Sequence, residues 1–147
     1  MDPQRILDTI NAHRRRHRAA ELQWDSTCAA AAQNWANRGY FISDQDSWGR
    51  FGESLAVSDT NYDATTECAN AINSWQGEES SYVYDNLASP GTCRFTQNVW
   101  RSTTHVGFGF SSGAVDQYGK YWASFVVAKF FPPGNIEDKF EDNVLLP

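Results

Sequence analysis

The segment 121–131, YWASFVVAKFF, constrains the fold of this chain more than any other stretch. Successive side chains of a strand point to opposite faces of a sheet. Large apolar residues fall on both faces of this strand, three on each: Tyr121, Phe125 and Val127, and Trp122, Val126 and Phe130. Because such a strand has to be covered on both sides, the segment predicts an α+β fold, a three-layer α-β-α sandwich around a small central antiparallel sheet.

The rest of the chain supplies helices for the two outer layers. Apolar residues recur at helical spacing in three segments. Asp25 and Ser26 are the candidate caps of the second helix, and the third helix is expected to start near Asp63. The expected elements, in chain order, are helices over residues 4 to about 17, 26–38 and 63–76, a short helix over 95–100 and a strand over 105–110.

Length and composition fit one domain spanning residues 1–147, and 14% aromatic residues supply a large apolar core. No apolar run approaches the roughly 20 residues that cross a bilayer. The N-terminal residues, MDPQRILDTI, do not form a signal peptide, although a mature fragment with an added initiator Met would look the same. We therefore expect either a secreted protein whose signal was removed or a cytoplasmic, Golgi-membrane-associated one.

Charge is divided unevenly along the chain. Residues 1–18 hold five arginines against two aspartates, whereas the remainder holds seven basic and sixteen acidic residues. An acidic body excludes nucleic acid as the expected partner. The basic cluster has two interpretations, attraction to anionic lipid headgroups or arginines that complement a helix C-terminus; its members are Arg14, Arg15, Arg16 and Arg18.

The most specific motif is FTQNVWRSTTHVGFGF at residues 95–110, in which Thr96, Gln97 and Trp100 stand out. It resembles the signature of the CAP superfamily, the cysteine-rich secretory proteins, antigen 5 and pathogenesis-related class 1 proteins. Five more family-like motifs occur in family order: Leu7, Asn11, Arg14, His17, Leu22 and Trp24; Ala29, Ala32, Gln33, Trp35 and Ala36; GESLA at 52–56; Trp75, Glu78 and Tyr82; and PPGN at 132–135 with the ending 143–147.

The resemblance implies the same α-β-α sandwich and a non-enzymatic binding function. Relatives bind sterols, fatty acids or anionic membranes, and the chain is similar to the Golgi-associated plant pathogenesis-related type. We expect lipid, sterol, an anionic membrane surface or a protein as partner. Exposure of the aromatic residues between the second and third expected helices would favour a lipid-contacting loop; these are Tyr40, Phe41, Trp48 and Phe51.

The resemblance also implies a central cleft, where many relatives hold a divalent metal with two histidines and two glutamates. The glutamates correspond to Glu53 and Glu78, but Arg94 stands at one histidine position, and Ile42, followed by Ser43, stands at the other. Arginine offers only donors and cannot bind a cation. We expect Arg94 to pair with both carboxylates, giving a structural or anion-recognising cleft with no metal and no cofactor.

Catalysis has little support in the residues. The alternative function is a metal- or thiol-dependent hydrolase that uses Glu53 and Glu78, but the missing histidines remove the obvious base. His13 and His17 share a helical face, which is half of a zincin helix, yet Arg14 stands where that motif has its glutamate. No catalytic residue is assigned.

Three cysteines leave at least one thiol unpaired within the monomer. Cys28, Cys68 and Cys93 are interpreted as three buried thiols, or as one bridge, Cys68–Cys93 or Cys28–Cys68, with a free thiol. Few cysteines and no N-x-S/T sequon lean towards a reducing compartment. Cys93, next to Arg94, is the thiol in which a neighbouring cation would favour redox or crosslinking chemistry.

Overall fold

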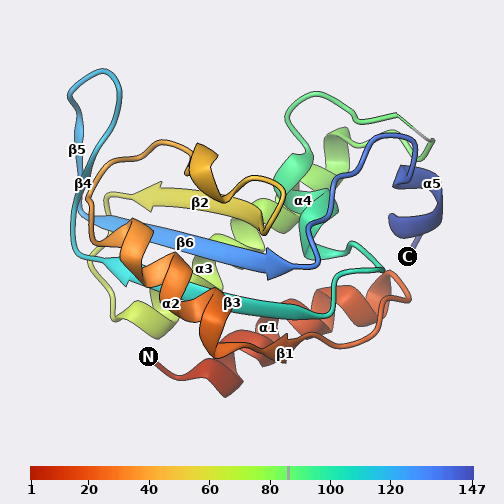
Figure 1. The fold of residues 1–147 in the computed structure, drawn as a ribbon, viewed down its shortest axis with the longest axis horizontal. Coiled ribbons are helices and arrows are strands. Elements are labelled where there is room, and N and C mark those ends of the chain that lie inside the picture. The colour runs from red at the N-terminus through yellow and green to blue at the C-terminus, as the bar shows by residue number, and fades with distance from the viewer. Residues whose placement is uncertain (86) are drawn as a thin grey trace.

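The computed structural model describes residues 1–85 and 87–147, and its elements form three layers (Figure 1). In chain order they are α1 (Pro3–Arg16), β1 (Gln23–Trp24), α2 (Ser26–Ala36), the 3-10 turn η1 (Gln45–Ser47), β2 (Gly52–Ser58), α3 (Ala64–Gln76), η2 (Gly77–Ser81), α4 (Cys93–Asn98), β3 (His105–Ser111), β4 (Ala114–Val115), β5 (Tyr121–Trp122), β6 (Ser124–Phe131) and α5 (Phe140–Asn143).

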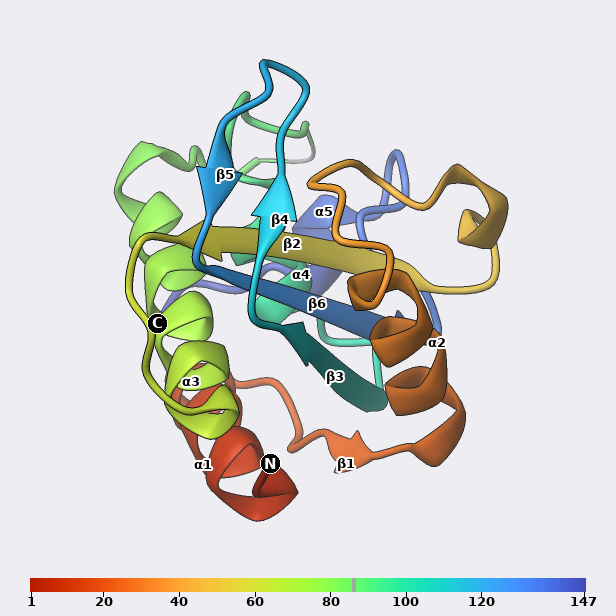
Figure 2. The ribbon, with the colours of Figure 1, turned by 90° about the vertical axis from the view of Figure 1, so that its left-hand side faces the viewer.

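The central sheet has the strand order β1-β3-β6-β2. Strands β2 and β3 flank β6 and run antiparallel to it, while the two-residue β1 adds a parallel edge next to β3. Helix α2 covers one face, and α1 and α3 cover the other, as Figure 2 shows end-on. The predicted α-β-α sandwich is confirmed.

Strand β6 is buried on both faces, as its composition predicts. Phe125 and Val127 pack with Ala32 and Ala36 of α2. Val126 and Phe130 point to the opposite side and pack with apolar residues of α1 and α3, among them Ile6, Ile10, Ile72 and Trp75. The two layers of helices are thus held by alternate residues of one strand.

One part of the strand prediction is wrong. Tyr121 and Trp122 do not belong to the central strand but form β5, which pairs with β4 in a separate two-stranded hairpin. The hairpin projects from the end of the sandwich (Figure 2), and Tyr121 is exposed there. The break falls at Ala123, whose amide bonds to the carbonyl of Ser58 at the end of β2.

Arg14 is fully buried, although the sequence grouped it with surface arginines. Its guanidinium donates to the carbonyls of Ala20, Asn98, Trp100 and Thr103 at 2.8–3.0 Å. Burial lowers the pKa of Arg14 to about 10. This side chain therefore ties the end of α1 to the loop between α4 and β3, which the signature motif encodes.

The G-x-G spacing in β3 allows α2 to lie directly on the sheet. A Cβ added at Gly107 would lie 2.0 Å from the backbone nitrogen of Ala29, and one at Gly109 would lie 2.5 Å from the carbonyl carbon of Ala32. Because backbone atoms cannot yield as a flexible side chain can, the glycines are required by packing.

We predict that Gly109→Ala lowers the free energy of unfolding by about 1–3 kcal/mol through overpacking. Gly77→Ala is the matched control, because a Cβ there meets no atom within 4 Å, and it should change stability by less than about 0.5 kcal/mol. Urea denaturation followed by tryptophan fluorescence compares the two. Equal effects would show that the contact with α2 does not limit this position.

No helix within residues 1–85 or 87–147 has both the length and the apolar character needed to cross a membrane.

Candidate functional site

The signature residues build the support for the cleft. Gln97 is buried; its Nε2 donates to Thr103 and its Oε1 accepts from the amide of Gly134, at 3.2 and 2.9 Å. Thr96 donates its hydroxyl to Oδ1 of Asn135 at 2.6 Å. Trp100 packs edge-on against Phe140, with ring centroids 4.9 Å apart. Together these contacts fix the PPGN segment and the C-terminal region onto α4.

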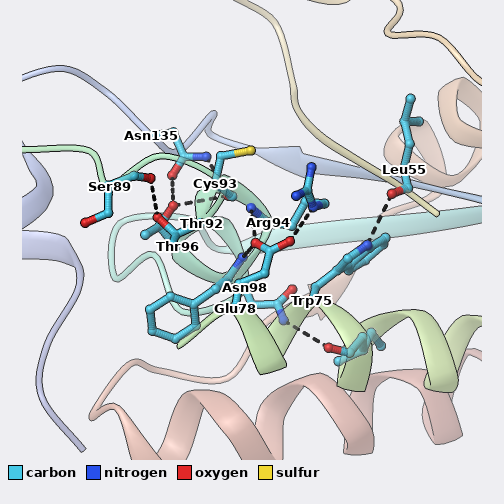
Figure 3. Close-up of polar contacts among 12 residues, drawn as sticks. Leu55, Trp75, Glu78, Ser89, Thr92, Cys93, Arg94, Thr96, Asn98 and Asn135 are labelled. Atoms are coloured by element: carbon cyan, nitrogen blue, oxygen red, sulfur yellow. Dashed lines mark hydrogen bonds and ion pairs between the residues drawn. The ribbon is translucent and has the colours of Figure 1, made fainter. Parts of the chain in front are cut away.

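Glu78 and Arg94 form an ion pair at the start of α4 (Figure 3). Arg94 Nε lies 2.5 Å from Oε2 of Glu78, while the backbone amides of Arg94 and Phe95 donate to Oε1, each at 3.1 Å. The carboxylate thus satisfies free amides of the first helical turn as well as the guanidinium.

Glu53 has a different cation. Lys129 of β6 is fully buried, and its Nζ lies 2.6 Å from Oε2 of Glu53, 2.7 Å from Oγ of Ser47 and 3.2 Å from Oδ2 of Asp44. The backbone amide of Asp44 also donates to the Glu53 carboxylate at 3.1 and 3.3 Å. The lysine therefore sits between two carboxylates and a hydroxyl.

The prediction that Arg94 pairs with both glutamates is consequently wrong for Glu53. Arg94 pairs with Glu78 alone, and Lys129 supplies the charge that Glu53 needs. The physical reason is strand alternation. Glu53 and Lys129 are paired residues of β2 and β6, so their side chains point to the same face of the sheet, whereas Ser54, the next residue of β2, points to the other face. Two cations, Arg94 and Lys129, therefore do what Arg94 alone was predicted to do.

A cavity of about 250 Å³ is lined by one residue of each ion pair. Glu53 and Arg94 both line it, together with Ser43, Cys93, Phe41, Ser54 and Leu55. Ser43 thus reaches the cleft as expected. Ile42 does not line this cavity: its side chain is exposed, and its carbonyl accepts a hydrogen bond from Trp35 Nε1 at 2.8 Å.

The donor set of this cleft does not fit a divalent metal. Arg94 offers only donors, and Glu53 already accepts from a lysine ammonium at 2.6 Å. A dication would have to displace a buried, hydrogen-bonded cation. Within the described residues no group of three or more His, Cys, Asp or Glu side chains is arranged to hold a metal ion.

None of the three histidines lines this cavity of Glu53 and Arg94. His13 contacts Asn73 at 2.7 Å, and His105 contacts the hydroxyl of Thr104 at 2.8 Å. His17 is buried beside Phe95, with Nδ1 2.8 Å from the carbonyl of Leu145 and Nε2 3.4 Å from Glu79. His13 and His17 are thus engaged with different partners and do not form a shared site.

All three cysteines are free. Cys28 and Cys68 are buried, and burial raises the pKa of each thiol to about 12. Cys93 is exposed, so the expectation of three buried thiols is wrong at this position, and neither bridge forms.

Lys129 is not among the cleft residues predicted from the sequence, although its surroundings in the sequence indicate a buried charge. Lys129 is the one charged residue of FVVAKFF, a segment that the fold buries on both faces. A lysine there has to find a carboxylate inside the protein, because burying an unpaired charge is too costly. Lys129 meets Glu53 because the two residues are paired across β2 and β6, and it meets Asp44 because of the path of residues 41–51. No local pattern encodes the strand pairing or the path of the loop.

We predict that Lys129→Met lowers the free energy of unfolding by about 3–5 kcal/mol at pH 7, because Glu53 is left buried without its cation. Adding Glu53→Gln should recover part of this loss. Arg94→Gln is the comparison: the Arg94 side chain is 39% exposed, so its removal should cost about 1 kcal/mol or less. Denaturation curves that gave Lys129→Met and Arg94→Gln the same cost would contradict the assignment of Lys129.

Comparisons with known proteins agree with this architecture. Residues 7–130 match the family model described as CAP, the cysteine-rich secretory protein family. The chain is 31% identical over 150 residues to the human Golgi-associated plant pathogenesis-related protein 1, covering 97% of this chain and 91% of that protein. It is 35% identical over 137 residues to the secreted protein RBT4 of Candida albicans, covering 90% of this chain.

The chain spans 35% of the length of RBT4 and 40% of Protein PRY2 of Saccharomyces cerevisiae. A solved structure of NaASP2 with Zn²⁺ has a TM-score of 0.72 and 24% identity, over 91% of this chain and 80% of that one. At this identity the similarity shows the fold alone.

Proposed function

The chain belongs to the CAP family of cysteine-rich secretory proteins, and on that premise we propose that it is a non-enzymatic binding module for a neutral lipid, a sterol in particular. The observation that carries the proposal is a cavity of about 620 Å³ beside α4. Small-molecule sites usually measure about 300–1,000 Å³.

Apolar and polar residues both line this cavity. Leu87, Ala88 and Phe140 contribute apolar side chains, and Ser89 and Asn135 are among the polar residues. Leu87 is 69% exposed, an arrangement that favours burial of its side chain against an apolar ligand.

Charge favours a neutral ligand over an anionic one. Glu137 and Asp138 line the cavity, so an anionic headgroup would meet like charges there. Three arginines of the basic cluster near the N-terminus already have partners within the protein, which weakens their attraction to an anionic membrane. Arg14 is buried, Arg15 pairs with Glu21 at 2.7 Å, and Arg18 donates to the carbonyl of Leu146 at 3.1 Å.

Two of the four aromatic residues in the loop between α2 and β2 are placed where they could contact a membrane surface. Tyr40 and Trp48 are 58% and 61% exposed, and such side chains suit the interface between water and lipid. Phe41 instead packs against Phe125, and Phe51 is buried. We propose that the two exposed residues let the module rest on a membrane from which it takes its ligand.

Hydrolysis is not favoured by any contact in the cleft. No histidine lines the cavity that contains Glu53 and Arg94, and both cleft glutamates are held by cations. A carboxylate held in this way is a poor general base.

A binding assay with the fluorescent sterol dehydroergosterol tests the proposal. We predict saturable binding to the parent protein. Ala88→Trp should weaken this binding by about tenfold or more, equivalent to about 1.4 kcal/mol, because the indole occupies the cavity. The matched control is Ala12→Trp on the exposed side of α1, which should leave the affinity unchanged.

Flotation with neutral vesicles, with and without sterol, and with anionic vesicles identifies the source of attraction. Capture that depends on anionic lipid alone, or equal sterol binding by parent and Ala88→Trp, would overturn the assignment to this cavity.

A further inference from the structure

The smaller cavity, which is lined by one residue of each cleft ion pair, contains an accessible thiol beside unused hydrogen-bond donors. Cys93 and Arg94 line it from the start of α4, and Ser54 lines it from β2. Figure 3 shows the sulfur of Cys93 pointing away from Glu78, on the other side of the helix start. The thiol and the ion pair therefore do not compete for the same space.

Ser54 is the least explained polar group in this region. The residue is 2% exposed, and its Oγ has no hydrogen-bond partner among the described residues. Buried hydroxyls are nearly always paired, and an unpaired one points to a missing partner. Because Ser54 lines the cavity, an acceptor group entering that cavity would supply the partner.

Among the residues that the structure describes, only one of the guanidinium nitrogens of Arg94 is engaged in a hydrogen bond. Its Nε is taken by Glu78, whereas the two terminal nitrogens make no hydrogen bond with any residue in the described ranges. Guanidinium nitrogens arranged as a fork match the two oxygens of a carboxylate. Glu53 also lines the cavity, but Lys129 balances its charge, so an entering carboxylate does not face an uncompensated one.

The three thiols differ sharply in accessibility. Cys28 and Cys68 are buried with pKa values raised to about 12, while Cys93 is exposed. Since the thiolate is the reactive form and has to be reached by its partner, chemistry of thiols in the folded protein is confined to Cys93.

We propose that Cys93 is a site of reversible mixed-disulfide formation with a small thiol compound that carries a carboxylate, which Arg94 and Ser54 recognise. The Cys93 thiolate attacks one sulfur of a low-molecular-weight disulfide. A new bond forms between Sγ and that sulfur, the original S–S bond breaks, and the other half leaves as a thiolate that takes a proton from water. Cys93 is oxidised and the departing half is reduced, so no further oxidant is needed.

Three symmetrical disulfides test the proposal on the folded protein at pH 7: dithiodipropionate, which is anionic, hydroxyethyl disulfide, which is neutral, and cystamine, which is cationic. Intact-protein and peptide mass spectrometry follow the rate and the position of the adduct, and each rate is divided by that of N-acetylcysteine. We expect a single adduct on Cys93, formed about tenfold faster with the anionic reagent than with the neutral one.

Three variants separate recognition from simple exposure. Cys93→Ser should remove the adduct. Ser54→Ala and Arg94→Lys should each reduce the preference for the anionic reagent, measured as the ratio of the anionic to the neutral rate in the same variant, by about threefold or more.

Equal rates with the three reagents, a preference that survives both variants, or an adduct on Cys28 or Cys68 at a comparable rate would overturn the proposal. It does not depend on sterol binding, because the assay contains no lipid and reads a covalent mass.

Discussion

A lysine ammonium buried between two carboxylates connects the central strand of the sheet to the edge strand β2 and to the loop before it. Lys129 belongs to the central strand β6, Glu53 to the edge strand β2, and Asp44 and Ser47 to the loop that precedes it. Removing any one partner leaves a charge or a hydroxyl in an interior that cannot solvate it. The position of residues 43–47, and with it one wall of the cleft, therefore depends on this ammonium.

The opposite wall is fixed by the signature motif, which acts here as scaffold. Arg14 holds the loop after α4 through four carbonyls, and Gln97 and Thr96 hold the PPGN segment against the helix. With α4 fixed in this way, Cys93 lines cavities on two sides, the larger one with Leu87 and Phe140 and the smaller one with Ser54 and Arg94. The two proposed binding sites thus share the start of α4.

Much of the fold could be predicted because it depends on local composition. The two apolar faces of β6 required a helical layer on each side. Asp25, one of the two candidate caps, caps α2, and α3 starts next to Asp63 as expected. The parallel edge strand β1 and the break before Ser124 could not be predicted, since both depend on pairing between distant segments. Arg14 was open to prediction: it follows Ile6 and Ile10 at steps of four and so lies on their buried stripe. For the cleft, residue types at family positions predicted that Glu78 meets Arg94 but not that Lys129 takes Glu53.

The central claim is that side-chain cations occupy the charge role of a metal in this cleft. Zinc content measures it most directly. After dialysis of the pure protein against zinc and then against buffer, elemental analysis should find well below one equivalent, and the midpoint of thermal unfolding should not change with zinc or a chelator. Retention of one equivalent of zinc, lost in Glu53→Gln or Glu78→Gln, would contradict the claim.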